Sequence, residues 1–182
     1  MPANAEVQEV ALAELKDAAK SLMRLPDNEV YGIVFYGTES LDALGLVYAT
    51  RSGLAKRLAR KHRRPDAHPW PDVVDELDSG GWDEGLGKNA FGCPRLNDIV
   101  CDVGDPGLSK RSIELALVAA LVAAQRPKGP LRAPCFSQPP FVGIHLPGCA
   151  LDFQVRTSKH VNDPLWHEKM LRWRDHQRAF EE

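Results

Sequence analysis

Three residues in the C-terminal half of the chain have the types that nucleophilic catalysis uses. Cys135, His145 and Asp152 would serve as a nucleophile, a base and the acid that orients the base. Geometry defines such a site, and order along the chain does not, so a small buried thiol at Cys135 is the favoured interpretation. The alternative of a small cytosolic enzyme with an unrecognised site stays open.

The histidines and glycines do not follow the spacing of known metal or phosphate sites. His62 and His68 are close in sequence, and His160 and His167 flank an expected helix start, but the chain has no HExxH and no Cys-x-x-Cys motif. The glycines between 80 and 87 follow no strand and lack the GxxxxGK[ST] pattern. We therefore expect no metal, no cofactor and no catalytic residues.

Acidic residues with neighbouring tryptophans form the best candidate for a binding surface, inside the Pro-, Gly- and charge-rich segment 65–92. Acidic side chains can occupy the basic active site of a toxin that acts on nucleotides or nucleic acids, while aromatic residues supply affinity. A surface loop with buried tryptophans explains the same residues equally well. The expected partner-binding residues are Asp72, Asp75, Glu76, Asp78, Trp82, Asp83 and Glu84.

A basic helix is expected over 51–64, directly before this acidic segment. Thr50 has the type of an N-cap, and Pro65 ends the pattern. Its exposed lysines and arginines would neutralise phosphates, which makes a nucleic-acid binder a further alternative. A solvated helix face is favoured, because aromatic residues are not interleaved with the cations.

Composition excludes several classes of protein. The chain has 182 residues, a formal net charge of -2 and four cysteines without the density of a secreted scaffold. The N-terminus lacks the pattern of a secretory signal, and no uninterrupted apolar run has the length of a membrane helix. We expect a single domain, 1–182, in the cytoplasm, with reduced thiols and no membrane contact.

The elements that would position these residues are organised around a β-hairpin at 29–50, where two β-branched and aromatic runs flank a turn. Apolar periodicity predicts a helix over 6–25, a helix over 109–126 that is buried all round, and a last helix that starts at Pro164. Residues 127–140 are expected to form a proline-rich connection, 141–146 a strand, and 151–156 another strand or extended edge. The predicted class is α+β, with an antiparallel or mixed sheet built on the hairpin and helices packed on one face.

This pattern resembles a bacterial family of small α+β proteins in the style of the immunity proteins of polymorphic-toxin systems, including the SUKH type. The matching pieces are the strand 30–36, Ala49-Thr50 before a helix, the apolar helix before 141–146, and the stretch 158–164. Asp163 separates Asn162 from Pro164, where the resemblance would place an Asn-Pro pair. The resemblance implies that the protein binds and neutralises a cognate toxin or effector domain by occluding its active site, without catalysis of its own.

Overall fold

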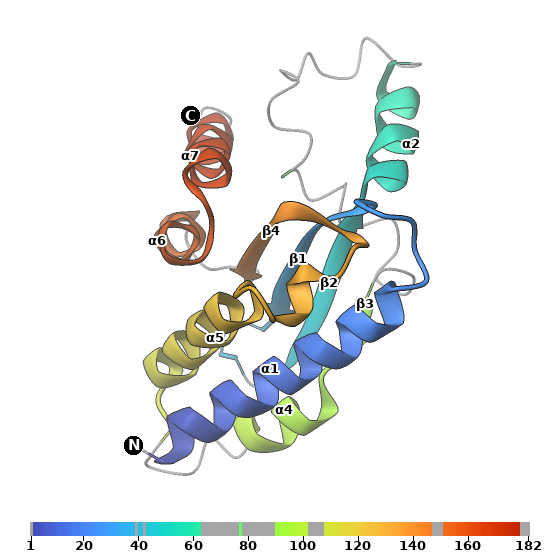
Figure 1. The fold of residues 1–182 in the computed structure, drawn as a ribbon. Coiled ribbons are helices and arrows are strands. Elements are labelled where there is room, and N and C mark those ends of the chain that lie inside the picture. Colours follow the sequence, from blue (N-terminus) through green and yellow to red (C-terminus); the bar gives the residue numbers. More distant parts are fainter. Residues whose placement is uncertain are drawn as a thin grey trace.

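The computed structural model describes residues 2–38, 40–41, 43–62, 77, 90–101, 108–146 and 151–178. Figure 1 shows the helices and strands in these residues. The helices are α1 (Pro2–Leu22), α2 (Arg51–His62), α4 (Pro94–Val100), α5 (Lys110–Ala124), α6 (Leu151–Val161), α7 (Pro164–Arg178) and the short 3-10 helix η2 (Pro130–Arg132). The strands are β1 (Val30–Gly37), β2 (Leu44–Thr50), β3 (Ala90–Gly92) and β4 (Phe136–His145). The predicted α+β class is confirmed.

The predicted hairpin lies at the centre of the sheet. β1 and β2 pair in antiparallel register, and the strand order is β3-β2-β1-β4. Asn97 of α4 fixes the start of β2, since its side-chain oxygen accepts from the N–H of Leu44 (2.7 Å) and its amide donates to the Leu44 carbonyl (3.1 Å). The prediction of a central hairpin over 29–50 is confirmed.

The last strand begins earlier than predicted. β4 is parallel to β1 and starts at Phe136, so the prediction that 127–140 is only a connection is wrong for its last five residues. The pairing moves from Val30 opposite Phe136 to Gly32 opposite Phe141, so the stretch with Pro139 and Pro140 bulges out of the ladder. An edge strand tolerates prolines at such a bulge, because their missing N–H groups have no ladder partner to lose.

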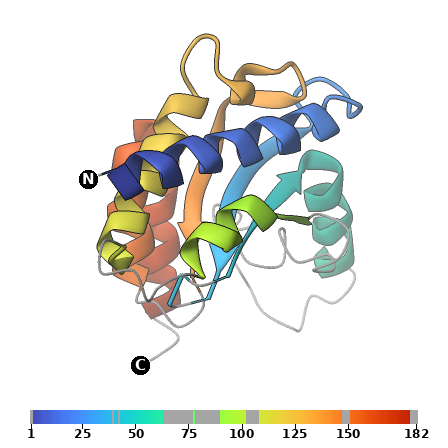
Figure 2. The ribbon, with the colours of Figure 1, turned by 90° about the horizontal axis from the view of Figure 1, so that it is seen from below.

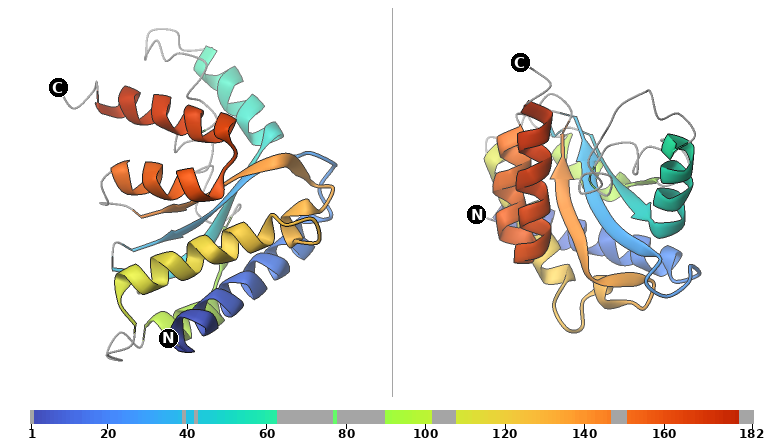
Figure 3. Two further views of the ribbon diagram at one scale, coloured as in Figure 1. Left: turned by 60° about the vertical axis from the view of Figure 1, so that its left-hand side comes forward. Right: turned by 90° about the horizontal axis from the view of Figure 1, so that it is seen from above.

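Helices cover both faces of the sheet. Ile33 and Phe35 of β1 contribute to a core with α1, α4 and α5, whereas Val34 points to a second cluster with Trp166 and Met170 of α7. Figure 3 shows α1, α4 and α5 on one side of the sheet and α6 and α7 on the other, and Figure 2 shows α1 and α4 crossing the first side. The expectation that helices pack on one face only is therefore wrong.

Residues 151–156, predicted as a strand or extended edge, instead begin helix α6. The helix contacts β4, α5 and α7, and Phe153, Gln154, Val155 and Thr157 are all buried. The sequence alternates because one buried position holds a polar residue, Gln154, so residue type does not mark exposure there. None of the helices in the described part combines the length and the apolar character needed to cross a membrane.

Helix α5 forms where the apolar run predicts it, but one side of it is open. Ser109 is the N-cap, and its hydroxyl accepts from the N–H of Ser112 at 3.1 Å, as its residue type predicts. Ile113 and Leu117 pack in the core, whereas Leu115 is 49% exposed and Val122 is 38% exposed. The expectation of burial all round over 109–126 is wrong, because α1, β4 and α6 cover only part of the helix circumference.

The corner between α6 and α7 closes the outer edge of β4. Asp163 caps α7 by accepting from the N–H of Trp166 at 2.9 Å, and Pro164 is the first helical residue, as predicted. The side chain of Asn162 accepts from the N–H of Val142 (2.9 Å) and donates to its carbonyl (2.7 Å). An edge residue of the sheet thus receives both hydrogen bonds that another strand would otherwise provide.

Candidate functional site

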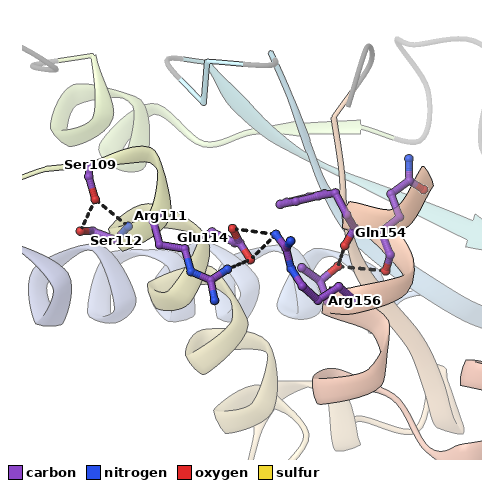
Figure 4. Close-up of polar contacts among 8 residues, drawn as sticks. Ser109, Arg111, Ser112, Glu114, Gln154 and Arg156 are labelled. Atoms are coloured by element: carbon purple, nitrogen blue, oxygen red, sulfur yellow. Dashed lines mark hydrogen bonds and ion pairs between the residues drawn. The ribbon is translucent and has the colours of Figure 1, made fainter. Parts of the chain in front are cut away.

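A buried carboxylate lies between two arginines where α5 meets α6. The Glu114 side chain is 8% exposed; it forms an ion pair with Arg111 one helical turn earlier and accepts from Arg156 Nη2 at 3.2 and 3.3 Å. Figure 4 shows both guanidinium groups converging on this carboxylate from two different helices. Its burial is compensated by two cations, so the cluster keeps a net positive charge.

The two arginines are held in place by their own helices. The Ser109 cap fixes the first turn of α5, which carries Arg111. The guanidinium of Arg156 lies 5.5 Å from the centre of the Phe153 ring, and the Thr157 hydroxyl donates to the Phe153 carbonyl at 3.1 Å. Stacking on an aromatic ring and pairing with a fixed carboxylate both restrict the rotamers of an arginine. The cluster is therefore preorganised.

Much of each arginine side chain remains accessible. The side chains of Arg111 and Arg156 are 58% and 55% exposed, although both contact Glu114. An arginine has five N–H donors, and the two oxygens of one carboxylate satisfy only part of the ten donors of two arginines. The remaining donors are suited to carboxylate or phosphate groups of another molecule.

Exposed apolar residues lie next to this charged cluster on α5. Leu115 and Val122 are seven residues apart, so their directions around the helix differ by only about 20°. Val118 and Ala119 lie between them and are partly exposed. We call these four residues the α5 stripe. An apolar stripe beside preorganised arginines is typical of a surface that binds a protein.

The nucleophilic site considered as an alternative is not formed. Phe136, which follows Cys135, pairs with Val30, and His145 pairs with Tyr36, so Cys135 and His145 lie about 20 Å apart along the sheet. Cys135 is buried, and this burial raises the pKa of its thiol. The proposed acid, Asp152, instead pairs with Arg178 of α7 at 2.9 Å. The alternative of an enzyme built on Cys135, His145 and Asp152 is therefore excluded, because β4 separates the first two, and the favoured interpretation of Cys135 as a buried thiol is confirmed.

Two of the described histidines take part in ring stacking or polar contacts. His145 stacks on Tyr36 with ring centres 5.5 Å apart, and Nδ1 of His167 lies 3.4 Å from the Ser158 hydroxyl. Among the described residues, no group of three or more histidine, cysteine or acidic side chains is placed to hold a metal ion. His68 and the side chain of His62 lie outside the described residues.

The acidic patch predicted as the partner-binding surface stays a prediction. Asp72, Asp75, Glu76, Asp78, Trp82, Asp83 and Glu84 all lie outside the described residues. Leu77, which is described, is buried in the cluster that contains Val34, Val47 and Trp166. An apolar residue between the acidic positions is thus part of the core on the α7 side of the sheet.

Helix α2 forms as predicted, with Thr50 as its N-cap. The Thr50 hydroxyl accepts from the N–H of Gly53 at 3.1 Å. Arg51 and Lys56 are exposed, and Nε of Arg51 donates to the Asn28 carbonyl at 3.0 Å. The other cationic side chains of 51–64 lie outside the described residues. The hypothesis of nucleic-acid binding through this helix stays a prediction.

Sequence reasoning missed the cluster around Glu114. Glu114 and Arg156 are 42 positions apart, and only the packing of α6 on α5 brings them together. One signal was present: Glu114 is the single carboxylate in the apolar run 112–125. No family model, curated protein or solved structure matches this chain, so the resemblance to immunity proteins stays a prediction.

Proposed function

We propose that this protein acts by binding another protein, as an immunity protein that neutralises a cognate bacterial toxin or effector domain. The observation that carries the proposal is the outer side of α5, where Leu115 and Val122 are exposed beside the arginine cluster of Glu114. Arginines and apolar side chains that lose their water together account for much of the affinity of protein interfaces.

The arginines and the α5 stripe favour binding because their side chains are already ordered before a partner arrives. Ordering a flexible side chain at an interface costs about 0.5–1.5 kcal/mol. Arg111 and Arg156 are already held by Glu114, so part of this cost is met when the protein folds. The stripe lies on a helix that is anchored in the core through Ile113 and Leu117, which keeps its position fixed as well.

Neutralisation by occlusion requires a stable scaffold and a complementary surface, and no reacting group. Two surfaces of this chain are candidates: the α5 stripe with its arginines, and the acidic positions 72–84 predicted from the sequence. The first would contact acidic groups of a partner, and the second would enter a basic active site.

Co-expression tests the proposal directly. The coding sequence would be expressed in a bacterium together with the toxin domain encoded beside it in its own genome, and growth would be measured with each protein alone and with both. We expect growth arrest by the toxin and its relief by this protein, with a stable complex on size-exclusion chromatography. Continued arrest with both proteins folded and present would refute the proposal.

Substitutions separate the two surfaces. Lysine in place of Asp75, Asp78 and Glu84 should reduce the association rate if the acidic positions carry binding. Leu115→Asp should reduce affinity if the α5 stripe carries it. Leu165→Asp is the matched control, because Leu165 is 61% exposed on α7 and lies outside both surfaces. Loss of relief with the control variant alone would contradict both assignments.

A further inference from the structure

Helix α5 presents its exposed apolar residues between cations. Arg111 precedes the α5 stripe in the first turn of α5, and Arg126 follows the stripe just beyond the end of the helix at Ala124; both are exposed. Counted around the helix axis, Arg111 points within about 40° of Leu115. The exposed face therefore has an apolar centre, with one cation in its first turn and another directly after its last residue.

The residues that follow α5, and those on α6 beside it, strengthen this positive character. Lys128 follows Arg126 and is exposed, and Arg156 and Lys159 are exposed on α6 beside α5. The one carboxylate of α5, Glu114, is buried and already paired with two arginines. Asp152, which is exposed on α6, is paired with Arg178. The charge that complements this face is negative.

We infer that the α5 stripe accepts an acidic amphipathic helix of a protein partner, an inference that rests on the proposed function and names the partner's chemistry. The backbone groups of α5 are hydrogen-bonded within the helix, so a partner cannot add to it as a strand and must bind through side chains. Ala119, the small residue of the stripe, allows close approach of a second helix axis.

The geometry specifies the pattern of the partner helix. Its apolar residues should recur at i, i+3 or i+4, and i+7, to match Leu115, Ala119 and Val122. Glutamates or aspartates should flank these residues at both ends, within reach of Arg111 and Arg126. A helix of about four to five turns covers the whole face.

A second copy of the same chain fits this face poorly. Two α5 helices packed antiparallel about Ala119 would bring Arg111 of one copy close to Arg126 of the other. Parallel packing would place each arginine beside its equivalent. Both arrangements oppose like charges across the contact, which disfavours association. An acidic partner meets opposite charge at both ends.

A selection experiment tests the inference with a defined probe. A displayed library of 18-residue helical peptides, randomised at their surface positions, would be selected on the folded wild-type protein. We expect enriched peptides with acidic residues on both sides of an apolar i, i+3/i+4, i+7 pattern. Their affinity should fall on the order of tenfold with Leu115→Asp and with Arg126→Glu, and stay unchanged with Leu165→Asp.

Other outcomes would overturn the inference. These are enrichment of peptides without acidic flanks, no enrichment, binding unaffected by Leu115→Asp, binding of the face to vesicles of anionic lipid, or a dimer in sedimentation equilibrium that Leu115→Asp dissociates. Relief of toxicity by Leu115→Asp would overturn the inference and leave the proposed function intact. Failure of the wild-type protein to relieve toxicity would refute the proposed function, whatever peptides the selection returns.

Discussion

Replacing Asn162 with alanine should destabilise the fold by opening the outer edge of β4. The Asn162 side chain accepts from the N–H of Val142 at 2.9 Å, and donates to the Val142 carbonyl at 2.7 Å and to the Ser158 hydroxyl at 3.1 Å. Val142 itself is fully buried. Its two backbone groups would therefore lose their partners in a place with little access to water.

The size of the effect follows from these contacts. A hydrogen bond contributes about 1 kcal/mol net, and a buried polar group left without a partner costs about 1–3 kcal/mol. With two backbone groups affected and partial relaxation, we expect Asn162→Ala to lower the free energy of unfolding by about 3 kcal/mol. With a urea m-value of about 2 kcal/mol per molar, the midpoint would fall by about 1.5 M.

Asn162→Asp separates the two hydrogen bonds to Val142. A carboxylate still accepts from the Val142 N–H, but its other oxygen faces the Val142 carbonyl, so the pKa of this new carboxyl should rise in the folded state. A raised folded-state pKa gives stability that is present at low pH and lost as the pH increases through that pKa. Urea unfolding of the aspartate variant should therefore show a larger loss relative to wild type at about pH 7.5 than at about pH 4.5.

His160→Ala is the control for the Asn162 variants. His160 is exposed two residues away, and His160→Ala should change the free energy of unfolding by less than about 0.5 kcal/mol. If Asn162→Ala behaved like His160→Ala, and if the loss in Asn162→Asp did not depend on pH, the Asn162 side chain would not be holding the edge of β4.

Three further predictions concern other parts of the fold. The pKa of His167 is lowered, chiefly by burial and to a smaller extent by two nearby cations, so the unfolded state binds more protons than the folded state. The free energy of unfolding should therefore decrease as the pH falls from about 6.5 through the folded-state pKa. His167→Gln should flatten this pH dependence in urea titrations. Burial raises the pKa of the Cys93 thiol to about 12, so an aromatic disulfide reagent at about pH 8 should modify Cys93 only in urea, whereas the exposed Cys101 should react in the folded protein. Leu117→Ala should lower the free energy of unfolding in urea by about 3 kcal/mol, because this side chain is fully buried. Leu115→Ala should lower it by less than about 1 kcal/mol, because this side chain is half exposed. Equal losses in the two variants would contradict the open side of α5.

Much of the secondary structure was predictable because its signals are local. Thr50, Ser109 and Pro164 each stand at the start of a helix and satisfy or avoid its first unpaired N–H groups. The hairpin at 29–50 carries both its strand residues and its turn residues in one stretch. Such elements need no distant partner in order to be recognised.

The errors concern elements whose character depends on their neighbours. The start of α6 resembles a strand because its polar residue Gln154 stands at a position that packing against other elements buries. The first half of β4 contains Pro139 and Pro140, and only its position at the sheet edge, with a bulge opposite Val30 and Gly32, makes a strand possible there. Neither circumstance can be read from the residues themselves.

The sequence by itself determined which segments of this protein are apolar, where helices begin and which pair of strands forms the hairpin, since hydrophobic period, caps and turns act over a few residues. Tertiary structure alone decided that β4 separates Cys135 from His145, that Arg156 meets Glu114, and that one side of α5 stays uncovered. The physical reason is that burial and ion pairing depend on which elements pack together, and that choice involves residues far apart along the chain.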